Sequence, residues 1–135
     1  MGRVFFNIKK NIHTLNAAYS VLASDSGKTF IIDQSGGVFA VSLPDAAVAG
    51  AGWYCDFMVG TSSASAQTII ATDDDGDNIH ALTFAQDDTH TQNTGCDVIT
   101  VLASSEIGDS WSLFTDGTNW YVKGMIADND HLAFT

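Results

Sequence analysis

The stretch "WSLFTDGTNWYVKG", residues 111–124, decides the fold class of this chain. Two runs in which large apolar residues alternate with other residues flank the dipeptide Asp116-Gly117. Alternation with a period of two is typical of a half-buried strand, and Asp-Gly between two such runs is a strong signal for a β-hairpin. The stretch therefore predicts two antiparallel strands joined at Asp-Gly.

The side chains of this hairpin divide between two faces. Large rings on alternating strands usually belong to a core or an interface, so we expect one face to be core. The expected core residues are Trp111 and Leu113 on the first strand and Trp120 and Val122 on the second. The opposite face carries the predicted contact between subunits, which consists of Tyr121, Lys123 and Met125.

Outward from the hairpin, short strand-like runs recur about every 8 to 12 residues, which is typical of sandwiches, jelly rolls and small barrels. Examples are "TFIID" (29–33), "VFAVSL" (38–43), "WYCDFMVG" (53–60), "QTIIAT" (67–72), "IHALTFA" (79–85) and "CDVITVLAS" (96–104). We interpret the polar run at 86–95 as a loop. The prediction is an all-β fold, a single compact sandwich, jelly roll or small barrel of about eight short strands. Residues 1–17 are expected to form an extended N-terminal arm, and 18–135 the β domain.

The net charge of −11 is distributed unevenly along the chain. Residues 1–10 hold three cations and no acid, whereas the remaining residues hold two cations against 16 acids. An acidic body repels phosphate groups, so we expect no nucleic-acid partner. No apolar run approaches the roughly 20 residues that span a bilayer, and we find no secretory signal, so no membrane partner is expected.

Residues 1–10 combine these three cations with apolar side chains. A short basic segment on an acidic body suggests a tail that docks on a negative partner, with apolar residues adding an anchor. The alternative is an unstructured terminus whose lysines have no role. The predicted anchoring residues are Arg3, Val4, Phe5, Phe6, Ile8, Lys9 and Lys10.

One acidic cluster, "TDDDGDN", is a candidate metal site because Asp73, Asp75 and Asp77 alternate and offer oxygens to a hard cation such as Ca²⁺. An EF-hand loop needs Gly at its sixth position and Glu at its twelfth. Counted from Asp73, Gly76 is fourth and Phe84 is twelfth. A solvated hairpin turn is the favoured interpretation, and we predict no metal and no cofactor.

The other chemistry-bearing residues form no catalytic pattern, so the chain is predicted not to be an enzyme. No GxSxG elbow occurs, and nothing distinguishes a catalytic pair among the acids, although a small hydrolase with paired Asp residues is a third alternative. Cys55 and Cys96 are expected to be buried free thiols, because the lack of a signal sequence makes a disulfide less favoured. No two histidines are spaced as metal ligands; they are His13, His80, His90 and His131.

Three stretches together resemble the small β modules of surface proteins in tailed bacteriophage virions. They are "DSGKTFIID" (25–33), "VSLPDAAVAGAGWYCDFMVG" (41–60) and "GDSWSLFTDGTNWYVKG" (108–124). In such modules a turn and a strand precede an "LP" strand end, a small-residue turn leads to an aromatic strand, and a "DGTNW" hairpin closes the domain. The resemblance covers most of residues 19–126, with 61–107 matching only in strand rhythm.

The resemblance implies a structural virion component, of the capsid decoration (cement), head-fibre or tail-fibre type, that often assembles as a trimer. Fibres are usually longer, and one module plus an arm favours decoration of the head. The implied partner is the major capsid protein, and the implied location is the capsid surface after synthesis in the host cytoplasm. The alternative is a carbohydrate- or receptor-binding module of a fibre, which predicts an exposed aromatic platform rather than buried tryptophans.

Overall fold

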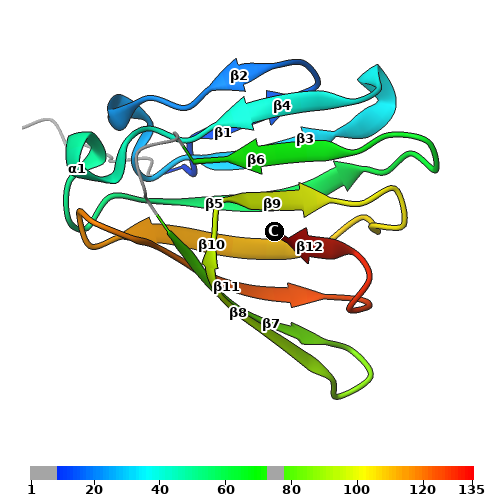
Figure 1. The fold of residues 1–135 in the computed structure, drawn as a ribbon. Coiled ribbons are helices and arrows are strands. Elements are labelled where there is room, and N and C mark those ends of the chain that lie inside the picture. Colours follow the sequence, from blue (N-terminus) through cyan, green and yellow to red (C-terminus); the bar gives the residue numbers. More distant parts are fainter. Residues whose placement is uncertain (1–8, 73–77) are drawn as a thin grey trace, which may run out of the picture.

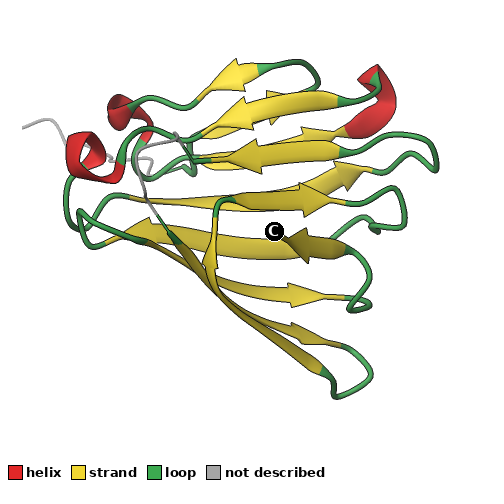
Figure 2. Cartoon of the chain, viewed as in Figure 1, coloured by secondary structure: helices red, strands yellow, loops and turns green. Residues whose placement is uncertain are grey.

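A computed structural model describes residues 9–72 and 78–135 of the chain. Within these ranges twelve strands form two sheets, one of seven strands and one of five (Figures 1 and 2). A single apolar core contains side chains of both sheets, so the fold is a β-sandwich. The predicted all-β class is confirmed.

The seven-stranded sheet is mixed, because β1, β3 and β5 run parallel to one another and so do β11 and β7. Antiparallel pairing joins β5 to β10, β10 to β11 and β7 to β8. In spatial order the strands are β1 (Ile12–Leu15), β3 (Thr29–Asp33), β5 (Tyr54–Thr61), β10 (Ser110–Thr115), β11 (Trp120–Ile126), β7 (Ile79–Ala85) and β8 (His90–Cys96).

The five-stranded sheet covers the inner face of the larger one, and it lies toward the viewer in Figure 1. In spatial order its strands are β12 (Leu132–Phe134), β9 (Val98–Val101), β6 (Thr68–Ala71), β4 (Phe39–Ser42) and β2 (Tyr19–Ser20). The helical elements are short: α1 (Ala46–Ala49) and two 3₁₀ turns at Ala23–Asp25 and Gln34–Gly36. None of the helices in the described ranges has the length and apolarity needed to cross a membrane.

Stacked rings form the centre of the core. Phe57 lies between Phe30 and Trp111, with ring centroids 5.2 and 5.5 Å away. Trp120 meets Trp53 edge to face at 5.4 Å. All three tryptophans are buried, as are Leu113 and Val122, so the core face predicted for the hairpin is confirmed.

The predicted hairpin is also confirmed, and its turn is built around Asp116. Strands β10 and β11 are antiparallel partners, with Ser110 opposite Met125 at one end of the ladder and Thr115 opposite Trp120 at the other. The Asp116 Oδ1 atom accepts hydrogen bonds from the amides of Thr118 and Asn119, both at 2.8 Å. Gly117 has a φ of +92°, a conformation that residues with a Cβ adopt only under strain.

The N-terminal boundary differs from the expected one. Residues 12–15 do not belong to an extended arm, because they form β1 and pair in parallel with β3. Leu15 is buried in the core. The run "IHTL" is too short to show a period, so the sheet partner rather than the local pattern makes it a strand. Residues 12–15 therefore belong to the β domain and not to the expected arm of residues 1–17, whose first eight residues lie outside the described ranges.

A second difference lies in the run expected to be a polar loop at 86–95. Residues 90–96 form β8, the edge strand beside β7. In β8 exposed polar side chains alternate with partly buried polar ones, so the strand has no apolar alternation that a sequence pattern would reveal. Polar edge strands are a common protection against unwanted sheet pairing.

Candidate functional site: the outer face of the seven-stranded sheet

Large apolar side chains are concentrated on one surface of the molecule. Eleven of them are exposed among the described residues, and seven lie at outward positions of the seven-stranded sheet. These seven are Ile12, Tyr54, Met58, Leu82, Phe84, Phe114 and Met125. We call this surface, formed mainly by β5, β10, β11 and β7, the outer face. The other four belong to α1 and to loops, so no strand of the five-stranded sheet carries one.

Cross-strand pairing places a row of rings on the outer face. Tyr54 pairs with Phe114, Phe114 with Tyr121, and Tyr121 with His80. The rings of Phe114 and Tyr121 stack with centroids 5.2 Å apart, and His80 lies 5.6 Å from Tyr121. We call these four residues the ring row. Sequence reasoning did not find it, because only the strand order brings the four residues together.

The Tyr121 hydroxyl donates a hydrogen bond to Asp116 Oδ2 at 2.9 Å. This bond to a carboxylate raises the pKa of Tyr121, because the neutral phenol is the form that donates. The contact also orients the tyrosine ring, so the turn of the hairpin holds the ring row in place at Tyr121.

A groove of about 480 Å³ lies beside the ring row. Ser110 pairs with Met58 on one side and with Met125 on the other, so a small side chain lies between two long ones. Ser112 continues this low floor along β10, and Phe84 lines the groove from β7. The volume is within the usual range for binding sites, roughly 300 to 1,000 Å³.

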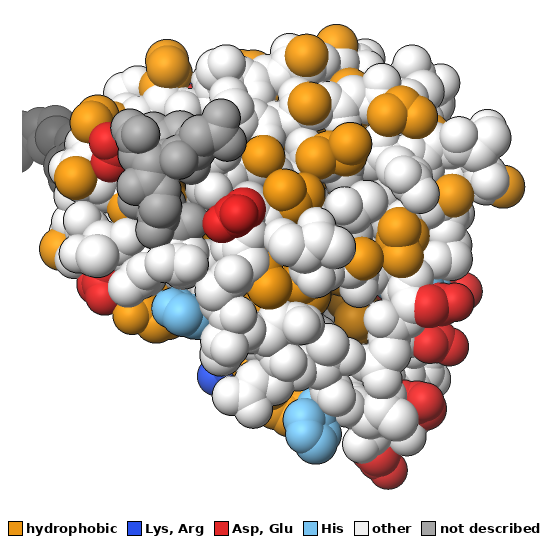
Figure 3. Space-filling model, viewed as in Figure 1, with side chains coloured by type: hydrophobic (Ala, Val, Ile, Leu, Met, Phe, Trp, Pro, Cys, Tyr) orange, Lys and Arg blue, Asp and Glu red, His pale blue; other side chains and the backbone are white. Residues whose placement is uncertain are grey.

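The groove has balanced charge in a strongly acidic protein. Asp56 is the only acid and Lys123 the only Lys or Arg in β5, β10, β11 and β7. Asp56 accepts a hydrogen bond from Ser112 Oγ at 2.7 Å and lies 3.9 Å from the exposed ammonium group of Lys10. Lys123 makes no ion pair within residues 9–72 and 78–135. The strands of the five-stranded sheet contain no charged residue, and Figure 3, which shows that side of the molecule, displays acidic groups mostly toward the edges of the view and almost no Lys or Arg.

The structure places the residues predicted to contact another subunit on this face. Lys123 and Met125 are exposed and Tyr121 is half-buried, and all three point away from the core. Lys9 and Lys10, the last residues of the predicted anchor, are exposed, and Lys10 borders the groove. The rest of the anchor (Arg3, Val4, Phe5, Phe6 and Ile8) lies outside the described residues, as do the metal candidates Asp73, Asp75 and Asp77.

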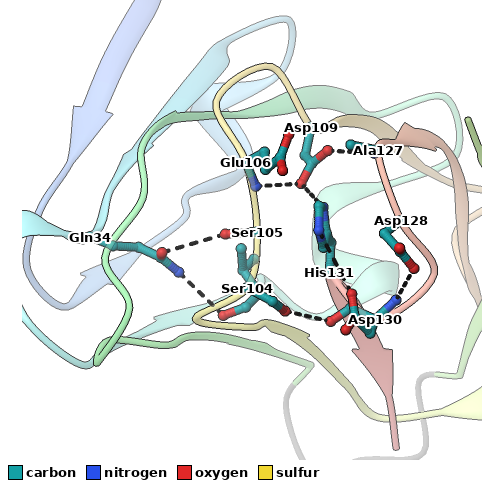
Figure 4. Close-up of polar contacts among 10 residues, drawn as sticks. Gln34, Ser104, Ser105, Glu106, Asp109, Ala127, Asp128, Asp130 and His131 are labelled. Atoms are coloured by element: carbon teal, nitrogen blue, oxygen red, sulfur yellow. Dashed lines mark hydrogen bonds and ion pairs between the residues drawn. The ribbon is translucent and has the colours of Figure 1, made fainter.

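A second polar cluster lies buried at one end of the sandwich (Figure 4). His131 Nδ1 is 2.6 Å from Asp109 Oδ2, and both side chains are almost fully buried. Asp109 also accepts hydrogen bonds from the amides of Glu106 and Ala127, each at 2.8 Å. No sequence pattern indicates this pair, because the two residues are 22 positions apart and belong to no motif.

We interpret this buried cluster as a structural support. The other ring nitrogen of His131 is 3.7 Å from the exposed carboxylate of Asp130. The two neighbouring serine hydroxyls bind elsewhere, Ser104 to the Asp130 carbonyl and Ser105 to Gln34 Oε1. In the part of the chain that the structure describes, no hydroxyl or thiol bonds to His131. The pair therefore lacks the nucleophile that a catalytic Asp-His arrangement activates.

Among the described residues, the cysteines and the potential metal ligands form no further site. Cys55 and Cys96 are buried free thiols, as expected, and burial raises the pKa of both, which keeps them in the unreactive thiol form. Across residues 9–72 and 78–135, no three His, Cys, Asp or Glu side chains gather closely enough to hold a metal ion.

No protein-family model matches this chain, and no curated protein matches it. The function must therefore be inferred from the side chains of the outer face and from the distribution of charge.

Proposed function

We propose that this chain is a non-enzymatic structural protein of a virion, a decoration protein that binds the outer surface of a phage head. The resemblance of three stretches to phage surface modules supports this class. The observation that carries the proposal is the position of Lys9 and Lys10. These cations begin the described chain, and Lys10 borders the groove of the apolar outer face, so the described end of the basic segment lies on the neutral, apolar side of the body.

Such a one-sided distribution suits attachment to a large assembly. The basic segment combines charge attraction to the shell with apolar anchoring by Val4, Phe5, Phe6 and Ile8. Many copies on one shell bind durably even when each contact is weak. Acidic side chains on the remaining surface stay hydrated and keep particles apart. The major capsid protein is the proposed partner, and assembly of three copies is the proposed state.

Co-sedimentation with purified shells from the same source tests this function. Residues 1–10, which include all three cations of the basic segment, should be deleted, because Asn11 accepts a hydrogen bond from the Thr29 amide and β1 begins at Ile12. We expect the truncated protein to keep the circular dichroism of a folded β protein and to stay in the supernatant, whereas the full chain pellets with shells. Equal pelleting of both proteins would contradict the anchor.

Two further variants separate the two parts of the anchor. One replaces Arg3, Lys9 and Lys10 with Gln, and the other replaces Val4, Phe5, Phe6 and Ile8 with Ser. We expect each variant to lose part of the shell binding, and we expect only the first to lose the salt dependence of binding, because only it removes the charges.

A carbohydrate-binding module is the second candidate function, and the ring row favours it. The buried tryptophans cannot form a platform, but Tyr54 and Phe114 are 53% and 46% exposed on a flat sheet. Flat apolar rings stack on pyranose faces. Titration calorimetry with host surface polysaccharide, comparing the wild type with Tyr54→Ala and Phe114→Ala, tests this function. Sugar binding that both variants lose, together with unchanged pelleting on shells, would favour the module over decoration.

A further inference from the structure

We propose that the outer face of the seven-stranded sheet is the contact surface between copies of this chain, centred on Met125, Lys123 and the groove above Ser112. This inference rests on the proposed function, for which it names one surface that joins two copies. A face that meets the same face of a second copy closes as a pair, so an assembly of three copies needs a further contact. It commits to a second copy as the occupant of the face, and exposed apolar area, charge and size each support that choice.

The first support is the amount of apolar side chain that faces water. Met125 is 73% exposed, and Phe84 and Met58, which flank it across the groove, are 45% and 40% exposed. Soluble monomers rarely expose large contiguous apolar patches, and such patches commonly mark interfaces. The other outer surface of the sandwich lacks this property, since no strand of the five-stranded sheet exposes a large apolar residue.

The second support is charge, which selects a second copy as the partner. Copies that carry a net charge of −11 repel one another, so they can approach most closely where the surface is neutral. The central strands are such a surface. They also carry one cation, Lys123, that has no ion pair among the described residues, and one carboxylate, Asp56, two strands away through Ser112. Each copy therefore offers both members of an ion pair, and a rotated second copy can match Lys123 to Asp56.

The third support is size. The seven strands hold 44 residues, which at roughly 3.3 Å per residue and about 4.8 Å between strands give a face of roughly 700 Å². Two such faces would bury roughly 1,400 Å², above the approximate minimum of 1,000 Å² for a specific interface. The four central strands alone would bury roughly 900 Å², so the contact has to extend over the flanking strands. The relief of the side chains adds to this flat area.

The shape of the face fits the same partner. Met125 projects beside a groove whose floor consists of Ser110 and Ser112, so a methionine from a second copy has room to enter. Methionine is well suited to such a contact because its flexible side chain fills irregular gaps. Since Lys10 borders the groove, contact through this face would gather the basic N-terminal segments of the copies and make their attachment multivalent.

Thiol labelling tests whether the face is covered. Both native thiols are buried, so a cysteine introduced at the surface is the main reactive group. Met125→Cys reports on the outer face, and Val48→Cys on α1 is the matched control, because Val48 is 69% exposed. We expect labelling of Met125→Cys to slow about tenfold once nine-tenths of the protein is assembled, because only free copies react. Val48→Cys should keep one rate at all protein concentrations, and an unchanged rate for both would overturn the inference.

Mass measured by light scattering tests whether the face holds the copies together. We expect the wild type and Val48→Asp to assemble, and Met125→Asp to remain at the 14.3 kDa of one chain while keeping a wild-type circular dichroism spectrum. Lys123→Glu should weaken assembly, and the double variant Asp56→Lys, Lys123→Glu should restore it, because the ion pair returns with reversed sign. A wild-type mass for Met125→Asp, or a wild type that is monomeric at every concentration, would overturn the inference.

The outcomes separate this inference from the proposed function. A wild type that pellets with shells but never self-associates would support decoration and overturn the copy contact. If Met125→Cys is protected only after shells or polysaccharide are added, the face binds those partners and the inference is again overturned. A wild type that self-associates through Met125 but never pellets would keep the inference and contradict decoration.

Discussion

Asp109 is the residue on which one end of the sandwich depends. Its carboxylate accepts three hydrogen bonds, from His131 and from the amides of Glu106 and Ala127. These contacts join the loop before β10 to the loop between β11 and β12. Because Asp109 is only 3% exposed, water cannot replace a lost bond at little cost.

We therefore expect Asp109→Asn to lower the free energy of unfolding by about 2 to 3 kcal/mol, since an amide nitrogen cannot accept the bonds now made to Oδ2. Urea unfolding measures this loss. Asp130→Asn is the matched control, because its side chain is 74% exposed, and it should change stability by less than about 0.5 kcal/mol. Equal effects of the two substitutions would show that the buried cluster is not a support.

Asp25 gives the protein a dependence on acid. Burial by itself raises the pKa of Asp25, but hydrogen bonds from Lys28 Nζ, the Leu22 amide and the Tyr19 hydroxyl outweigh burial, so the pKa is lowered. A lowered folded-state pKa stabilises the protein above the unfolded value of about 3.9, and this stabilisation is lost as the pH falls through the folded value.

Urea unfolding at a series of pH values measures the free energy of unfolding of the wild type and of Asp25→Asn. We expect the wild type to be more stable at neutral pH and the difference to shrink steadily as the pH falls below about 4, because protonated Asp25 loses its pairing with Lys28. Other acids titrate in both proteins and cancel in the difference. A difference that stays constant down to pH 2 would mean that the Asp25 carboxylate contributes no stabilisation through its charge.

Among the elements, the hairpin of β10 and β11 depends most on its turn. Gly117 has a φ of +92°, and a Cβ there would lie 3.3 Å from the Ala51 amide nitrogen. We expect Gly117→Ala to cost about 1 to 2 kcal/mol of stability, mainly through backbone strain. Thermal unfolding measures the change, and Thr118→Ala, an exposed neighbour in the same turn, is the control. If both variants unfold at the wild-type temperature, the turn does not limit stability.

At the scale of the whole molecule, salt should act in opposite directions on the two proposed contacts. Screening reduces repulsion between copies of net charge −11, so self-association should strengthen as salt rises from about 0.01 to about 0.1 M, where the Debye length falls from about 30 to about 10 Å. Binding of the basic segment to a negative shell should weaken over the same range. Sedimentation at each salt concentration measures both, and self-association that weakens with salt would mean that ion pairs outweigh the apolar contact.

By itself, the sequence determined the strands and the inward-facing side chains of the hairpin and of β5. Alternation and turn residues are local properties, and they place Trp111, Leu113, Trp120 and Val122 in the core without knowledge of the neighbouring strands. The charge division between the first ten residues and the rest is also fixed by the sequence. Strand β8 and the sheet position of β1 were missed, because a polar edge strand and a four-residue strand carry no such pattern.

Only the tertiary structure decided which strands are neighbours, and the outer face follows from that order. Strand β5 pairs with β10 and β11 pairs with β7 although other strands separate each pair along the chain, so Tyr54 and His80 meet the hairpin residues Phe114 and Tyr121. The same holds for the groove and for the buried pair of Asp109 and His131. These contacts depend on the packing of two sheets over one core, and long-range packing leaves no periodic signal in the chain.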